Sequence, residues 1–414
     1  MQSFTNQFIR FPIVFLFCCF FNCTSVSSVC GNSVPEYRFS KLKGGVNFGR
    51  YNNLKNRNLQ VGLKELQRDI DVLKTIGLRH VRFPLVPSDF WNGKDNSGVN
   101  QKMNFLIQAI AKCKANKIAV IADMHGGDKF NHKLKNEDTL NRFCKFWTLF
   151  ASILANRFGP DDLFFEGLNE PVMRYKDGWQ KKQEKILKAI RKGAPKHTIL
   201  VCGDFYTGID SLLALKPYKD TNVVYNFHYY TPFLFSHQGA SWITPQHGKL
   251  KKVPYPNISL NKIPAADQDS YYYLDKNGKK ISMRVKSNPD TIKANFYRQF
   301  KTNSKFDETA REYLDKFFNK KWYRKTIYDD IKRAADWGKR YDVRLVCTEY
   351  GVFRWGSDPD DRFRWIMDVT SGMNKYNIGH TMWSYAEGFG FIDFGPKGER
   401  YDKKFIWGAI QIPH

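Results

Sequence analysis

Short apolar runs alternate with helically periodic segments along most of this chain. In residues 63–77, for example, apolar side chains recur every three or four positions, as on one face of a helix. Eight strand-like runs can be recognised, at 44–49, 80–85, 118–126, 163–171, 198–204, 222–230, 342–351 and 378–385. Helical segments are expected between them at 63–77, 102–116, 138–157, 179–191, 209–214 and 360–374.

Strands that alternate with helices predict a parallel sheet with helical crossovers. Eight such strands are the number that closes a (β/α)8 TIM barrel. The alternative is an open, doubly wound sheet, which a glycine-rich phosphate loop after the first strand would favour. The sequence has no G-x-G-x-x-G or G-K-[ST] loop. We therefore predict an α/β fold of the (β/α)8 barrel type.

The connection after the sixth strand, residues 231–320, is too long for a minimal barrel. It is rich in Lys, Tyr, Asn and Pro. Connections of this length usually carry a function or a small structure of their own. We interpret it as an elaborated barrel loop that leaves from the barrel mouth, and not as a separate domain.

The first residues differ from the rest of the chain. Arg10 is the only charge before a short apolar run at 11–21, and small polar residues follow it. This order is typical of a secretory signal, and the run is too short to span a bilayer comfortably. We predict a signal peptide at 1–28, cleaved near Ser27 or Ser28, and one domain at 29–414. The protein would then be secreted, extracellular or periplasmic, with no membrane span after signal removal; an uncleaved anchor is the alternative.

Charge and cysteine content limit the kinds of binding partner that the sequence predicts. A net charge of +26 can attract nucleic acid or another polyanion. However, the sequence has no zinc-finger spacing, no basic helical stripe and no single-strand-binding aromatic motif, so no nucleic-acid partner is predicted. The charge is either compositional background or an attraction to an acidic polymer. The cysteines show no C-x-x-C spacing and the histidines form no H-E-x-x-H pair, so no metal is predicted.

Polar residues gather at the expected C-terminal ends of the strands, where barrels of this kind carry their chemistry. Because side chains alternate along a strand, residues of one parity should face the interior. This rule groups Asp123 with His125, and Cys347 with Glu349. It also groups Asn226, His228 and Tyr230. Each residue alone has a structural explanation, such as a turn or a core hydrogen bond. Their common position at the same end of successive strands favours a functional site. The full set is Arg82, Asp123, His125, Asn169, Glu170, Asn226, His228, Tyr230, Cys347, Glu349 and Trp383.

The ordered set resembles glycoside hydrolase family 5, the cellulase-like (β/α)8 glycosidases, from about residue 44 to 410. The family's asparagine and acid/base pair matches Asn169 and Glu170, and its nucleophile matches Glu349. The remaining matches are an arginine in strand two, a histidine after strand three, a His-x-Tyr in strand six and a tryptophan after strand eight, here Arg82, His125, His228, Tyr230 and Trp383. The segment 235–242 also looks like a loop of some bacterial members.

The resemblance implies hydrolysis of internal β-glycosidic bonds of a polysaccharide by a retaining two-carboxylate mechanism. Glu349 would be the nucleophile and Glu170 the acid/base. Arg82, His125, Asn169, His228, Tyr230 and Trp383 would bind or support. The substrate would be a polysaccharide or oligosaccharide, with β-1,4-glucan as the first candidate. The chemistry requires no cofactor. β-Mannan and β-1,3-glucan remain alternatives, as does a carbohydrate-binding protein without activity.

Two further expectations concern residues around these. Glu166 has the parity of Glu170 deeper in the same strand, and a carboxylate buried there needs a partner that the sequence does not identify. In the long loop, Trp242 and the tyrosines Tyr271, Tyr272 and Tyr273 are candidates for sugar stacking or for packing of the loop. The loop is expected to form one wall of the substrate cleft.

Overall fold

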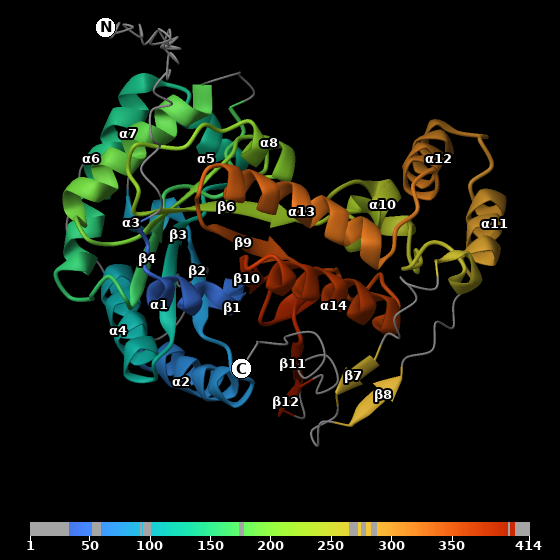
Figure 1. Ribbon diagram of the computed structural model, residues 1–414, viewed down its shortest axis with the longest axis horizontal. Helices are drawn as coiled ribbons and strands as arrows, with labels where there is room; N and C mark the ends of the chain where they lie inside the picture. The colour runs from blue at the N-terminus through green and yellow to red at the C-terminus, as the bar shows by residue number, and fades with distance from the viewer. Residues whose placement is uncertain are drawn as a thin grey trace, which may run out of the picture.

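The computed structural model (Figure 1) describes residues 33–51, 59–91, 93, 101–173, 178–264, 272–274, 279–282, 288–395 and 398–401. Eight parallel strands form a closed barrel in the order β1-β10-β9-β6-β5-β4-β3-β2. The predicted (β/α)8 barrel is therefore confirmed. The strands are β1 Lys43–Asn47, β2 His80–Leu85, β3 Ala119–Met124, β4 Leu163–Glu166, β5 Ile199–Cys202, β6 Val223–Tyr229, β9 Leu345–Tyr350 and β10 Gly379–Met382.

Helices surround the barrel. The larger outer helices are α2 Leu59–Thr75, α4 Gln101–Ala115, α6 Glu137–Ala155, α7 Gly178–Gly193, α13 Arg324–Arg340 and α14 Pro359–Lys375. Shorter helices are α1 Glu36–Phe39, α3 Pro87–Phe90, α5 Gly127–Lys133 and α8 Ile209–Leu213. Local chemistry sets several starts: Asn136 caps α6 by accepting from the N–H of Thr139, and Asp358 caps α14. Most predicted helices agree with these bounds within a few residues.

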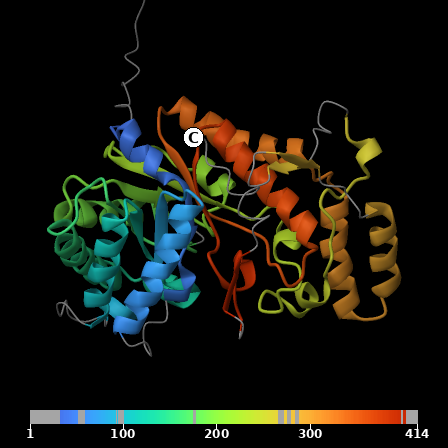
Figure 2. The same cartoon turned by 90° about the horizontal axis from the view of Figure 1, so that it is seen from below.

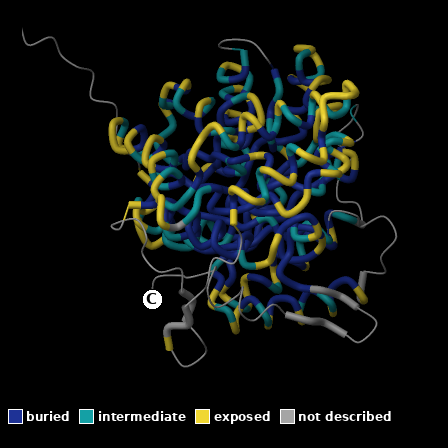
Figure 3. Tube along the Cα trace, turned by 90° about the vertical axis from the view of Figure 1, so that its right-hand side faces the viewer, coloured by how far each residue is buried: buried dark blue, intermediate teal, exposed yellow. Residues whose placement is uncertain are grey.

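Alternation along the strands builds two apolar layers. Side chains that point outward, such as Val81, Val120 and Phe165, pack against the helices in the main core. Side chains that point inward fill the bottom of the barrel, namely Ala119, Ile121, Phe164, Leu200, Val224 and Val346, with Val34, Phe39 and Leu42 closing it from below. Figure 3 shows this buried centre surrounded by exposed surface. This lower layer is mainly apolar, although His80, opposite Ala119, hydrogen-bonds to Thr381 within it. The main polar cluster lies above it, toward the mouth.

A bulge in β9 changes the predicted parity of that strand. The β6–β9 register shifts between Phe227 and His228, so that Cys347 is opposite Phe227 while Glu349 is opposite His228. Cys347 lies in the outer core, and the Thr348 side chain instead points to the interior side, where it contacts His228. The prediction that Cys347 and Glu349 share a face was therefore wrong. Bulges near active sites commonly re-aim a side chain in this way.

The long connection after β6 carries short elements of its own. They are α9 Phe233–Ser236, α10 Pro245–Lys249, β7 Tyr272–Leu274, β8 Lys280–Ser282, α11 Pro289–Gln299 and α12 Lys305–Phe318. Figures 1 and 2 show α11 and α12 side by side at the end of the molecule opposite α6 and α7. The first part of the connection stays at the barrel mouth, where Ala240 packs with Phe353 and Phe389. Near the C-terminus, β11 Ile392–Gly395 pairs with β12 Gly398–Tyr401.

Several predictions fall outside the described residues or are addressed only in part. The proposed signal at 1–28 and residues 402–414 lie outside them, as do Tyr271 and the side chains of Tyr272 and Tyr273. Among the helices that the structure describes, none has both the length and the apolar character needed to cross a bilayer. The described cysteines are free thiols, at Cys113, Cys144, Cys202 and Cys347.

Candidate active site

Arg82 is the centre of the polar cluster above the apolar layer. It lies in β2 and is completely buried. Its Nε and Nη2 donate to the two carboxylate oxygens of Glu166 at 2.8 and 2.9 Å, a bidentate pair. Its Nη1 donates to Glu349 Oε1 at 2.7 Å and to Asn47 Oδ1 at 2.9 Å. One guanidinium thus connects β1, β2, β4 and β9, and it is the partner of Glu166 that the sequence left unnamed.

The nucleophile candidate, Glu349, is held at the end of β9 by two donors. Arg82 contacts Oε1, and the hydroxyl of Tyr230 donates to Oε2 at 3.0 Å. The His228 ring is farther away, with Nδ1 at 3.6 Å from Oε2. The side chain is only 6% exposed, so its lone pairs are directed by the protein rather than by bulk water.

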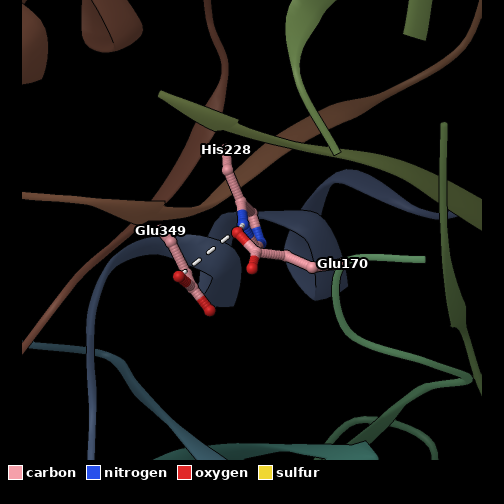
Figure 4. Close-up of side chains that lie close together, drawn as sticks. All are labelled: Glu170, His228 and Glu349. Atoms are coloured by element: carbon pink, nitrogen blue, oxygen red, sulfur yellow. Dashed lines mark hydrogen bonds and ion pairs between the residues drawn. The ribbon is translucent and has the colours of Figure 1, made fainter. Parts of the chain in front are cut away.

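Glu170, the acid candidate, approaches the same nitrogen of the His228 ring as Glu349 does. His228 Nδ1 lies 2.9 Å from Glu170 Oε1, and Figure 4 shows both carboxylates beside this imidazole. The Glu170 backbone is left-handed, with φ 41°, which costs a non-glycine residue roughly 1–3 kcal/mol. The side-chain amide of Asn131 stabilises this turn by donating to the Glu170 carbonyl at 2.7 Å. The backbone is therefore held in a strained conformation where the strand ends at the mouth.

Asn169, His125 and Trp383 form the adjoining wall. Asn169 Oδ1 accepts from Arg82 Nη2 at 2.8 Å, and its Nδ2 lies 3.3 Å from His125 Nε2. The other ring nitrogen of His125 lies 2.9 Å from Asp123 Oδ2. The His125 ring stacks on Trp383 with centroids 5.6 Å apart. All eight residues proposed from the sequence thus lie in one connected cluster, although their catalytic and binding roles remain predictions.

Burial shifts the pKa values of the titratable groups in different directions, upward for the carboxyl groups and downward for the imidazole of His228. Burial raises the pKa of Glu170, and the neighbouring Asp128 adds to this effect while His125 and Arg82 oppose it. Burial also raises the pKa of Asp123 to about 7 and that of Glu166 in the same direction, against the lowering effect of Arg82. Burial lowers the pKa of His228 to about 4, so its imidazole is neutral near neutral pH. A carboxyl group with a raised pKa beside a neutral histidine suits a general acid.

Some contributing residues carried little or no signal in the sequence. Asn47 in β1 donates to the carbonyls of Thr348 and Met382 and accepts from Arg82. Asn131 holds the Glu170 turn from α5, and Thr348 contacts His228 only because of the bulge. Asn226 had the right parity, and it donates to Glu166 Oε1 at 2.9 Å. A lone asparagine in an apolar strand was the only available clue to Asn47.

The same cluster contains ligand types that metals use. Among the described residues, Glu170, His228 and Glu349 each offer one such atom, and these atoms lie within 4.8 Å of one another. Metal–ligand bonds of about 2 Å would require the three groups to draw together from their hydrogen-bonded positions. In the structure, His228 Nδ1 instead contacts both carboxylates, at 2.9 Å from Glu170 and 3.6 Å from Glu349.

Comparison with known proteins assigns the family. The cellulase model, glycosyl hydrolase family 5, matches residues 45–388. Endoglucanase C of Acetivibrio thermocellus is 26% identical over 365 residues, covering 84% of this chain and 92% of that protein. Endoglucanase 3 of Fibrobacter succinogenes is 24% identical over 397 residues, covering 91% of this chain and 54% of that protein.

Solved structures agree with the barrel. Thermotoga maritima Cel5A in complex with cellobiose superposes with a TM-score of 0.65 at 21% identity, covering 91% of this chain and all of that one. The outer helices and the strand order thus follow a known architecture. The family model extends from β1 to the residues just after β10. The chain belongs to glycosyl hydrolase family 5, the cellulase family, and is a glycosidase.

Proposed function

We propose that the protein is a secreted, retaining endo-glycosidase that cleaves β-1,4-glucan. The observation that carries the retaining part is the approach of Glu170 and Glu349: one oxygen of each, with one His228 nitrogen, fits within 4.8 Å. Retaining glycosidases hold their two carboxyl groups roughly 5–5.5 Å apart, whereas inverting enzymes leave room for a water between them. The short separation supports direct attack by a carboxylate on the sugar.

The roles follow from the two environments. Glu349, contacted by Arg82 and Tyr230, is proposed as the ionised nucleophile that forms a bond to the anomeric carbon. Glu170, with its raised pKa, donates its proton to the departing glycosidic oxygen and later takes one from water. Asn169 Oδ1 accepts from Arg82 and its Nδ2 lies 3.3 Å from His125 Nε2, which leaves the second N–H of the amide for a sugar hydroxyl. Trp383 offers an indole face beside them.

Exposed aromatic side chains at the mouth support a polymeric substrate. In the described part of the chain, the exposed aromatic residues are Tyr37, Phe205, Tyr206, Phe233, Trp242 and Trp355. All except Tyr37 follow the C-terminal ends of β5, β6 or β9. Trp242 and Trp355 pack edge-on against the same ring, Phe353, at 4.6 and 5.3 Å. Amphipathic rings that remain wet around a catalytic centre suit the apolar faces of successive sugars.

The linkage is proposed from the relatives, because both quoted proteins are named endoglucanases. A polysaccharide screen with Glu349→Gln as the inactive control tests it. Release of short oligosaccharides from β-1,4-glucan, with a rapid fall in viscosity, is expected for internal cleavage. Preferential cleavage of β-mannan or β-1,3-glucan would replace the proposed substrate. Equal release by wild type and Glu349→Gln would contradict the enzymatic proposal.

Secretion is proposed from the signal-like residues 1–28, with the catalytic domain at 29–414. N-terminal sequencing of material recovered outside the cells should find a chain that begins near Val29. A soluble chain that still begins at Met1 would contradict this part of the proposal.

Replacing Trp242 by alanine should weaken the binding of long oligosaccharides more than that of short ones. Trp242 is 59% exposed, so the change removes a sugar-stacking surface with little loss of core packing. We expect kcat/KM for a hexasaccharide to fall about tenfold relative to that for an aryl disaccharide, the loss typical of one aromatic anchor. Tyr37→Ala is the matched control, since Tyr37 is 58% exposed on α1 at the closed end of the barrel. An identical ratio in both variants would exclude Trp242 from substrate binding.

A further inference from the structure

We propose that Thr348 and Asn226 are positioning residues that orient the His228 tautomer so that the exchangeable proton is held on Glu170. The inference rests on the proposed function, because it concerns how the acid of that reaction is kept ready. It follows from a chain of hydrogen bonds that begins at Glu166 and ends at Glu170. Each bond in the chain determines the direction of the next.

The orientation of the Asn226 amide is determined first. Its Nδ2 donates to Glu166 Oε1 at 2.9 Å, a carboxylate that can only accept while Arg82 binds it on both oxygens. Its Oδ1 accepts from the backbone N–H of Thr348 at 3.2 Å. A flipped amide would bring two donors together at Thr348 and two acceptors together at Glu166. Asn226 therefore presents a carbonyl oxygen, and no donor, to Thr348.

The Thr348 hydroxyl is determined next. Its Oγ1 lies 2.7 Å from Asn226 Oδ1, a distance that requires the single hydroxyl proton to be donated to that oxygen. His228 Nε2 lies 3.1 Å from the same Oγ1. With its proton already used, the hydroxyl can only accept from His228. The ring must therefore carry its proton on Nε2.

A neutral imidazole with its proton on Nε2 has a lone pair on Nδ1. The group at Nδ1 is Glu170 Oε1, at 2.9 Å, so the hydrogen bond is made when Glu170 is the donor. Glu349 Oε2 is 3.6 Å from Nδ1, beyond hydrogen-bonding distance, so Glu170 is the partner of this nitrogen. The network thus favours the protonated form of Glu170, and an ionised Glu170 would face a lone pair.

Other charged and titratable groups surround Glu170 without replacing this effect. They are Arg82 on β2, Asp123 on β3, His125 after β3, Asp128 on α5, Tyr230 after β6 and Glu349 on β9. The carboxylates disfavour a further negative charge on Glu170, whereas His125 and Arg82 favour it. His125 directs one nitrogen to Asp123 and the other to Asn169. Within the part of the chain that the structure describes, the hydrogen bond to His228 is the one that reaches the Glu170 carboxyl itself.

The arrangement serves both halves of the reaction. In the first, the Glu170 proton moves to the glycosidic oxygen as the bond to the anomeric carbon breaks and Glu349 bonds to that carbon. Glu170 is then a carboxylate opposite the Nδ1 lone pair, which makes it a stronger base. In the second, it takes a proton from water while the water oxygen bonds to the anomeric carbon and the bond to Glu349 breaks. Glu170 is thereby returned to its starting form.

Thr348→Val removes the hydroxyl and keeps the branched shape. His228 Nε2 then loses its acceptor, and the proton moves to Nδ1, where it can be donated to a Glu170 carboxylate. Glu170 would become more acidic, so activity should be lost at lower pH: the basic limb of the kcat/KM profile should move down by about one pH unit, or about tenfold in acid strength. Thr348→Ser keeps a hydroxyl and should retain the wild-type limb.

Two measurements make the result decisive. ¹⁵N NMR of the His228 ring reads the tautomer without turnover: Nε2–H is expected in the wild type and Nδ1–H in Thr348→Val. An Nδ1–H ring in the wild type, or an unmoved basic limb in a folded Thr348→Val variant, would overturn the inference. Absence of hydrolysis by the wild type would instead overturn the proposed function, and the NMR result would still judge the tautomer.

Discussion

Glu349→Ala should reduce turnover of polysaccharide by about 10⁴-fold or more, because it removes the group proposed to bond to the anomeric carbon. The fold should remain, since Arg82 keeps Glu166 and Asp123 as buried ion-pair partners at 2.8 and 3.0 Å. The measurement is kcat on soluble β-glucan, with circular dichroism and the unfolding midpoint to verify the structure.

Glu170→Ala should cause a loss of similar size on polysaccharide but behave differently on an activated aryl glycoside. A good leaving group needs no proton, so the first step should survive and the second should become limiting. Azide, a small nucleophile that needs no general base, should then accelerate turnover of Glu170→Ala and give a glycosyl azide of retained configuration, whereas any azide product of Glu349→Ala should have the inverted configuration. This difference distinguishes an acid/base from a nucleophile.

Glu387→Gln is a control from the same face of the barrel. Glu387 lies just after β10 in the short 3-10 helix Glu387–Phe389, and it is exposed. No hydrogen bond or ion pair links its side chain to the catalytic cluster in the described part of the chain. If Glu387→Gln loses as much activity as Glu349→Ala, the assignment of the catalytic carboxylates is contradicted. Near-normal activity in both Glu170→Ala and Glu349→Ala would contradict it as well.

Arg82→Met should have the largest effect on stability, and it should also abolish activity. Arg82 is completely buried and pairs with Asp123, Glu166 and Glu349. Removing one partner from a buried ion pair leaves charges without compensation and costs roughly 3–5 kcal/mol in the free energy of unfolding. We expect this loss near pH 7 in chemical denaturation.

The loss should depend on pH. Asp123 has a pKa of about 7 in the folded protein against an ordinary value of 3.8, so between these pH values the folded state binds more protons than the unfolded one. Stability from this group is therefore present at low pH and falls as pH rises. Arg82 lowers the pKa of both Asp123 and Glu166, so its removal enlarges the effect. The difference in unfolding free energy between wild type and Arg82→Met should be smaller at pH 5 than at pH 8.

Arg82→Lys provides the matched comparison. Lysine keeps one positive charge but cannot form the bidentate contact with Glu166. We expect an intermediate loss of stability with a weaker dependence on pH than that of Arg82→Met. If Arg82→Met loses the same free energy at both pH values, then the carboxylates do not couple to Arg82 in the way their distances suggest.

Much of the site could be anticipated because it lies where one-dimensional patterns are strong. Glu170 follows a four-residue buried strand, and His228 has the same interior-facing parity as Asn226. In a parallel barrel, the strand ends on one side must meet. The side-chain period of two then selects which residues face the interior, provided that the strand is regular. That condition holds for β2, β3, β4 and β6.

It fails for β9, and the failure has a physical cause. Alternation placed Cys347 and Glu349 together, but the extra residue Thr348 between paired positions turns Cys347 outward and leaves both Thr348 and Glu349 near His228. A bulge depends on how two strands fit each other, so neither strand contains a complete signal for it. The same holds for the partner of Glu166, since Arg82 is 84 residues away along the chain.

By itself, the sequence determined the eight strand-like runs, the helices between them and the order of polar residues at their ends, because these depend on local periodicity and on which residue types can be buried. Only the tertiary structure decided the direction of each hydrogen bond, the bulge that re-aims Glu349, and the internal elements of residues 231–320. Those features arise from contacts between segments far apart in the chain. The raised pKa of Glu170 belongs to the second group, since it depends on burial and on neighbours contributed by several different strands.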